Sequence, residues 1–162
     1  LELLFTEYYI LNPVFKGVWF DIWKHREEAT RINPHKAVDT MRHMANKEYY
    51  HMKKNGFNHK KLATMTRLEK AISDYMLGVK YENVLKSDQA DFFLRMKRGN
   101  FIDNDEQGMR IAQETYEAIN RIADRYLEHV PDVEDAEVRS KLMRGLTDLV
   151  CMHLRYEIEV RE

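Results

Sequence analysis

The stretch MRIAQETYEAINRIADRYLEHV, residues 109–130, carries the strongest hydrophobic pattern in the chain. Apolar residues return in it at alternating steps of three and four, the spacing that places side chains on one face of an α-helix. The members of this face are Met109, Ala112, Tyr116, Ile119, Ala123, Tyr126 and Val130. The pattern therefore predicts a long helix with a packing seam along one side.

A second pattern of this kind closes the chain. Over about residues 133–160 the same rhythm is followed by Leu142, Leu146, Leu149, His153, Tyr156 and Val160. Only a short turn that contains Pro131 separates the two predicted helices. We therefore expect them to pair as an antiparallel C-terminal hairpin.

Signals for helix starts and stops outline the rest of the chain. The pairs at 12–13 and 33–34 are both Asn-Pro, which places a capping residue before a proline suited to a first helical turn. Gly56 supplies a helix end, and Asn58 can cap the helix that follows. Before the two C-terminal helices we expect helices at roughly 2–11, 13–31, 34–54, 59–82 and 87–99.

The composition agrees with a protein built of helices. The chain has 162 residues, 44% of them hydrophobic, which suits one domain with its own core. It holds only 6 Gly and 3 Pro against 9 Met and 33% charged residues, and sheet-forming runs are absent. We expect an all-α fold: a single domain over residues 1–162, formed as a bundle of four or more long helices with shorter additional helices.

The single cysteine and the start of the chain bear on its surroundings. Cys151 excludes an internal disulfide and fits a reducing compartment, and we expect it to be a small buried thiol. No apolar run is long enough to span a bilayer, so we expect no transmembrane insertion and a soluble protein of a cytoplasm-like compartment. Because the chain begins with Leu1, a processed product or a fragment that has lost a targeting segment stays an alternative.

The motif EYYH, residues 48–51, places Glu48 and His51 three residues apart on an expected helix. At this spacing a helix directs both side chains to one side, as in bundles that hold iron or manganese ions with carboxylates and imidazoles. Such a site would be irregular, because a second Glu-x-x-His pair is missing. The candidates to complete it fall in or beside apolar stripes of other helices: His25, Glu28, Glu69 and His153.

The same helix allows a structural interpretation of EYYH, which we favour. Glu48 then lies beside the buried stripe and pairs with a surface cation such as Lys47 or Lys53. No cofactor is expected in this case, and iron or manganese only if the metal alternative holds. The stripe would comprise Val38, Met41, Ala45, Tyr49 and Met52.

Charge is distributed unevenly, although the net charge is only −1. Residues 36–70 hold nine Lys and Arg against three acids, and residues 101–137 hold eleven acids against three Arg. The basic region could bind phosphate or nucleic acid, or its helices could lie against the acidic ones, which we favour. The candidate contacts to nucleic acid are Lys53, Lys54, Lys60 and Lys61.

Residues 1–23 are rich in aromatic side chains and hold seven of the eighteen in the chain. They cover more than one face of a helix, and aromatic residues left outside a core commonly anchor protein interfaces. This N-terminal segment is therefore a candidate docking surface for a partner. Its aromatic residues are Phe5, Tyr8, Tyr9, Phe15, Trp19, Phe20 and Trp23.

These observations favour a non-enzymatic α-helical subunit that mediates protein–protein interaction within a larger assembly, through protein partners or self-association. Two alternatives stay open: a carboxylate/histidine metal-binding bundle, acting as a di-metal oxidoreductase or in metal storage, and a nucleic-acid-binding helical protein. No small-molecule substrate is indicated, because the chain has no Gly-rich phosphate loop, thiolate zinc cluster or Gly-x-Ser-x-Gly elbow.

Overall fold

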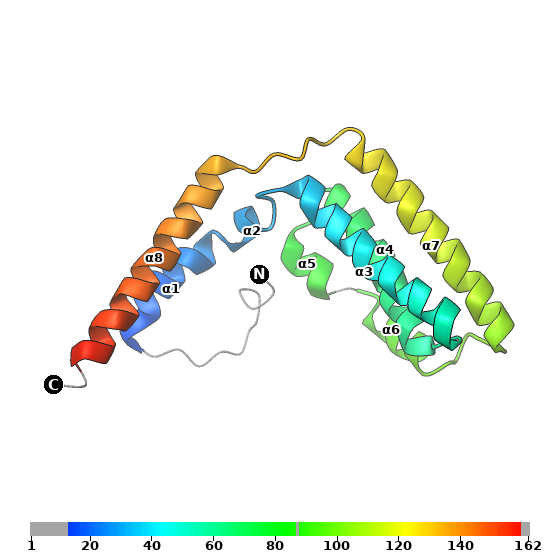
Figure 1. Cartoon of the computed structure of the whole chain (residues 1–162). Coiled ribbons are helices and arrows are strands. Elements are labelled where there is room, and N and C mark those ends of the chain that lie inside the picture. The colour runs from blue at the N-terminus through cyan, green and yellow to red at the C-terminus, as the bar shows by residue number, and fades with distance from the viewer. Residues whose placement is uncertain (1–12, 87, 160–162) are drawn as a thin grey trace. The chain divides into compact units, whose positions relative to one another are not determined.

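The computed structural model describes residues 13–86 and 88–159. In these ranges every regular element is a helix, so the all-α fold predicted from the sequence is confirmed. Contacts divide the chain into two compact units: unit 1 comprises residues 1–33 and 133–162, and unit 2 comprises residues 34–132. Figure 1 shows the helices of the two units.

Unit 2 is a bundle in which α4 is central. Its helices are α3 (Pro34–Asn55), α4 (His59–Met76), α5 (Tyr81–Lys86), α6 (Ala90–Lys97) and α7 (Asp105–Leu127). The long helices α3, α4 and α7 pack against one another, and α5 and α6 pack against α4 (Figure 1). The seam predicted over residues 109–130 thus faces two helices rather than one.

The core of unit 2 forms where the three long helices meet. Leu62 and Met65 of α4 and Ile119 of α7 are fully buried, and burial of such side chains contributes about 1.5–3 kcal/mol each. On α3 the buried residues are Val38, Ala45, Tyr49 and Met52. These are four of the five residues of the stripe predicted for this helix, and the fifth, Met41, is partly buried. Glu48 lies beside this core rather than in it.

Polar and aromatic pairs set the register between α3 and α7. Successive members are four residues apart on both helices and run in opposite directions along the chain, as an antiparallel pair requires. One of these pairs is a hydrogen bond between the hydroxyl groups of Tyr50 and Tyr116, and this bond raises the pKa of Tyr116 above its ordinary value. The pairs are Arg42 with Asp124 (Nη1 to Oδ1 2.7 Å), Asn46 with Asn120 (two bonds of 3.1 Å), and Tyr50 with Tyr116 (2.9 Å between hydroxyl oxygens).

Several helix ends follow the predicted chemistry. The side chain of Asn58 accepts a hydrogen bond from the Lys61 backbone N–H (3.1 Å), which caps α4 as predicted. α4 ends at Met76, earlier than the predicted residue 82, and Gly78 follows with a φ of 78° that an L side chain rarely adopts. The predicted start of the next helix at Ser87 lies outside the described residues.

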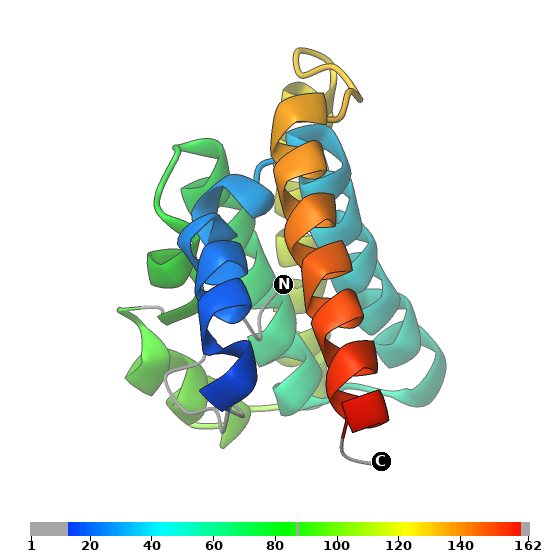
Figure 2. The ribbon, with the colours of Figure 1, turned by 90° about the vertical axis from the view of Figure 1, so that its left-hand side faces the viewer.

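Unit 1 pairs the first and last helices of the described chain. It contains a 3-10 turn, η2 (Pro13–Phe15), followed by α1 (Lys16–Lys24), α2 (Arg26–Ala29) and α8 (Ala136–Glu159). The segment 13–31, predicted as one helix, is therefore divided: it begins with the 3-10 turn, and His25 separates α1 from α2. α1 and α8 lie side by side and antiparallel (Figure 2).

Each of the two C-terminal helices packs against helices of its own unit. α7 packs against α3 and α4 within unit 2, whereas α8 packs against α1, α2 and the η2 turn within unit 1. Residues 131–135, between the two helices, are not helical, and the backbone N–H of Asp135 donates to the carbonyl oxygen of Ile32 (2.7 Å). This bond ties the start of α8 to the end of the α1–α2 segment.

Candidate functional site

A row of apolar side chains on α8 is open to solvent. Leu146 is 45% exposed, Met143 53%, Leu154 56% and Val150 57%. Their steps of three and four place them on one side of the helix. Single exposed apolar residues are ordinary, but a continuous apolar row on a surface commonly marks an interaction site. We call these four residues the open face of α8.

The adjacent side of α8 packs against α1, and close approach of the two helices depends on a glycine. A Cβ added to Gly145 would lie 2.9 Å from Cγ1 of Ile22, which is buried on α1. The partly buried residues on this side of α8 are Leu142, Gly145, Leu149, Met152 and Tyr156. α8 is therefore apolar on two neighbouring sides, and α1 covers only one of them.

Opposite charges stand at the two ends of the open face. Arg139 and Glu157 are 18 residues apart, which is five turns of an α-helix, so both lie on the side of the open face. The guanidinium of Arg139 also donates to Glu134 (Nη1 to Oε2 2.9 Å), and 63% of its side chain is exposed. The open face thus has Arg139 at its N-terminal end and Glu157 at its C-terminal end.

The described aromatic residues of the N-terminal segment serve mostly to pack unit 1. The ring of Phe15 lies 6.0 Å from those of both His153 and Tyr156 on α8. Trp23 stacks on Phe20 (5.7 Å), and the Arg26 guanidinium lies 3.7 Å from the centre of its ring.

Exposure differs among these aromatic side chains. Trp19 and Trp23 are only partly exposed, whereas Phe20 is 58% exposed. Phe5, Tyr8 and Tyr9 lie outside the described residues. Among the described residues of the predicted aromatic surface, Phe20 is therefore the one that lies most open.

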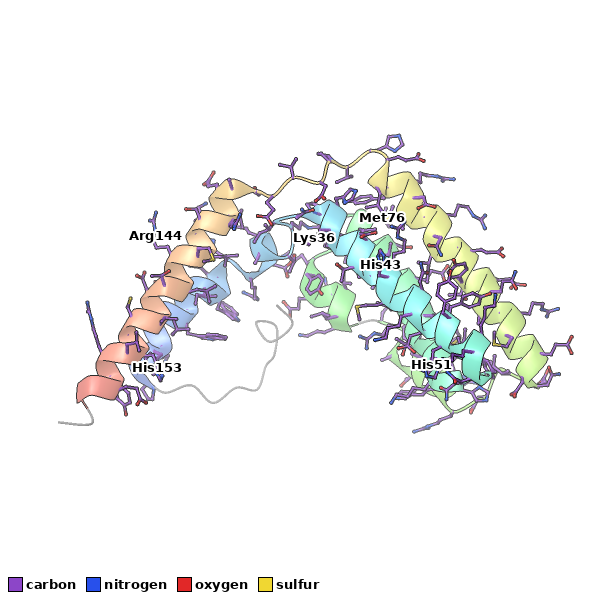
Figure 3. The ribbon with its side chains drawn as sticks, viewed as in Figure 1. Lys36, His43, His51, Met76, Arg144 and His153 are labelled. Carbon is purple, nitrogen blue, oxygen red and sulfur yellow. The ribbon has the colours of Figure 1, made fainter. Side chains whose placement is uncertain are left out.

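The EYYH residues have ordinary helix-surface partners. The carboxylate of Glu48 accepts a hydrogen bond from Nζ of Lys61 at 2.6 Å, so its partner is on α4 rather than Lys47 or Lys53 of its own helix. His51, labelled in Figure 3, is exposed and lies 3.3 Å from the side-chain nitrogen of Asn55. The lysine neutralises the carboxylate that would have been the first metal ligand.

The other metal candidates do not gather into a cluster in the part of the chain that the structure describes. His25 and Glu28 are brought together, with 3.1 Å between Nδ1 and Oε2. Glu69 is half-buried on α4, and His153 is exposed on α8 (Figure 3). Among the described residues, no three of His, Cys, Asp and Glu lie close enough to hold one ion, so the metal alternative gains no support.

The four lysines of the predicted nucleic-acid surface lie on two helices. Lys53 and Lys54 are in the last turn of α3, where Lys53 lies 5.7 Å from the centre of the Tyr49 ring. Lys60 and Lys61 are in the first turn of α4, and Lys61 is engaged by Glu48. Nucleic-acid binding stays a prediction.

The open face of α8 was missed because the sequence pattern mixed its two sides. The predicted seam joined Leu142 and Leu149, which face α1, to Leu146, which does not. His153 and Cys151 were both expected in the interior, and both are exposed, because α1 covers too narrow a side of α8 to enclose them. Counting apolar residues around the whole circumference of the helix would have revealed the second face.

Comparison with models of protein families, with curated proteins and with solved structures found no match for this chain. None of the helices in the described part of the chain combines the length and the apolar character needed to cross a membrane.

Proposed function

We propose that this chain is a helical assembly subunit that acts by protein–protein docking, and that its first contact is with a second copy of itself. The observation that carries the proposal is the open face of α8, four apolar side chains that are each about half exposed. Rows of this spacing bury themselves against another helix in bundles and coiled coils.

The ends of α8 favour an antiparallel pair of copies. If a two-fold axis passes between Leu146 and Val150, Leu146 of one copy faces Val150 of the other. The same axis brings Arg139 of each copy opposite Glu157 of the other, so opposite charges meet at both ends. A parallel pair would instead place like charges opposite each other, which is destabilising.

The expected affinity is moderate. Burying the exposed half of eight such side chains, four from each copy, contributes on the order of 1 kcal/mol each. Association costs on the order of 4–15 kcal/mol in lost freedom of motion, which consumes most of this gain. We therefore expect a dimer that forms at micromolar concentrations, with Phe20 of α1 left for a further protein partner.

The test is the mass of the full chain in solution, measured by light scattering after size-exclusion chromatography over a range of concentrations. The unaltered chain is expected to give a dimer that dissociates on dilution. The double variant Leu146→Glu, Val150→Glu should be a monomer, because it places four carboxylates in the centre of the interface. Arg144→Glu, on the exposed side of α8 labelled in Figure 3, is the matched control and should remain a dimer.

Three results would contradict this proposal. A chain that is monomeric at all concentrations would exclude self-association through α8. A dimer that persists in the Leu146→Glu, Val150→Glu variant would place the interface elsewhere. A monomer that loses thermal stability in the same variant would show that the chain itself covers the face.

A further inference from the structure

We infer that unit 2 carries a binding site for a small organic phosphate, in a cavity between α4, α5 and α6. The cavity has a volume of about 350 Å³, at the lower end of the range found for small-molecule sites. This site is separate from the open face of α8, and the inference is independent of self-association. Its lining residues are Lys60, Ala63, Thr64, Arg67, Leu85, Lys86, Ala90, Phe93, Leu94 and Lys97.

Four of the lining side chains are cations, and none is a carboxylate. Lys60 and Arg67 are seven residues apart on α4, two turns of helix, so they lie on the same side. Lys86 comes from the last turn of α5 and Lys97 from the last turn of α6. Three helices thus contribute positive charge to one concave surface, where the field of like charges is focused and attracts anions.

Most of this charge is not neutralised within the described part of the chain. Lys86 pairs with Glu82 on its own helix (2.9 Å). Lys60, Arg67 and Lys97 form no ion pair with any described residue. An anion in the cavity would relieve the repulsion among these cations and accept charge-assisted hydrogen bonds, which are about twice as strong as neutral ones.

A neighbouring cavity of the same unit is lined by carboxylates as well as by cations. It has the same volume of about 350 Å³ and shares Lys86, but its lining includes Asp74 and Asp88. Both carboxylates pair with Lys70, at 2.8 and 3.3 Å. The cations of that cavity, Lys70 and Lys86, are therefore paired within the protein. The remaining cations of the basic cavity between α4, α5 and α6 would be neutralised by an external anion: Lys60, Arg67 and Lys97.

The rest of the lining indicates an organic rather than an inorganic anion. Ala63 and Phe93 are buried, and Leu85 is partly buried, so the wall beside the cations is apolar. Thr64 adds a hydroxyl group, although it already donates to the carbonyl oxygen of Lys60 (3.0 Å). A ligand with a compact apolar body and a phosphate group would use both kinds of wall, since the body displaces water and the phosphate meets the cations.

The test is isothermal titration calorimetry of the full chain with phenyl phosphate at low salt. Inorganic phosphate and phenol, which each carry one half of this ligand, are titrated separately for comparison. We expect saturable binding of phenyl phosphate that is tighter than that of either half. The double variant Lys60→Gln, Arg67→Gln should weaken it by about tenfold or more, which is the loss expected when charged hydrogen bonds of this kind are removed. Both side chains are exposed, so the variant should fold normally.

The matched control is Lys53→Gln, Lys54→Gln, which removes the same charge from exposed positions of unit 2 outside the cavity. We expect it to bind phenyl phosphate with an affinity within about twofold of the unaltered chain, because only long-range attraction is lost. Equal weakening in both double variants, or no saturable binding at low salt, would overturn the inference. A short single-stranded oligonucleotide that displaces phenyl phosphate at a lower concentration of phosphate groups would also overturn it, by assigning the cavity to a nucleic-acid surface.

Discussion

The carboxylate of Glu69 lies half-buried on α4 and has no hydrogen-bond or ion-pair partner among the described residues. Burial without a partner disfavours its charged form, so its pKa is raised from the ordinary value of 4.5. Glu48, one of the other polar residues singled out in the sequence, lies beside Lys61 instead. Whether a carboxylate beside the core is neutralised thus depends on a cation from another helix, and the sequence does not reveal which helices meet there.

Replacing Glu69 should change stability in a pH-dependent way. Above the ordinary carboxyl range the folded protein bears the cost of a half-buried charge, so Glu69→Gln should raise the free energy of unfolding at neutral pH. Between the ordinary value of 4.5 and the raised pKa the folded state binds more protons than the unfolded state, so the stability of the unaltered chain falls as pH rises through this window. Below pH 4.5, where the carboxyl group is protonated in both the folded and the unfolded state, the stability advantage of Glu69→Gln should disappear.

Urea unfolding of both proteins across the acid-to-neutral range is the measurement. Glu114→Gln, which removes an exposed carboxylate of α7, is the control and should show no such trend. A stability difference for Glu69→Gln that is the same at every pH would mean that packing, and not the charge, determines it.

Among the elements, the long helices were predictable and their partners were not. Spacing of apolar residues and the Asn58 cap identified α3, α4 and α7, with nearly correct bounds for α3 but an end of α4 at Met76 rather than at residue 82. Their pairing depends on contacts between distant residues, such as Asn46 with Asn120, which local pattern does not encode. α8 was also predicted as a helix, but its contacts with α1 and α2 join the two ends of the chain, which local pattern does not reveal.

The contact between α1 and α8 should depend on the glycine at position 145. Gly145→Ala would bring a methyl group to 2.9 Å from Cγ1 of Ile22, so we expect a loss of about 1–2 kcal/mol in stability despite the better helix propensity of alanine. Gly17→Ala, on α1 with no atom within 4 Å of the new methyl group, should instead stabilise the protein by about 0.5–1 kcal/mol. Thermal unfolding of the two variants gives the comparison.

A second substitution separates crowding from any other effect at this position. In a chain that carries Ile22→Ala, the space for the new methyl group is free, so Gly145→Ala should cost nothing further. If Gly145→Ala costs the same with and without Ile22, the approach of α1 to α8 is not what the glycine permits.

At the scale of the whole molecule, the chain consists of two compact units, one of which begins and ends the sequence. Composition predicted that the chain is all-α, but the division into units depends on which helices pack together. Unit 2 encloses its core among three long helices, whereas α8 in unit 1 has an apolar side that no described helix of its own unit covers. This difference is why we assign the docking role to unit 1 and the ligand cavity to unit 2.

The central claim is that α8 pairs with a second copy of itself in antiparallel orientation. A pulsed electron paramagnetic resonance measurement on the full chain tests it directly, with a spin label at Ser140→Cys and with Cys151→Ser removing the native thiol, since Ser140 is exposed near one end of α8. In an antiparallel pair centred between Leu146 and Val150 the two labelled positions are 16 residues apart along the helix axis. At 1.5 Å per residue, the expected separation is roughly 25 Å. A distance near the spacing of adjacent helices, roughly 10 Å, or no distance within the dimer range, would contradict it.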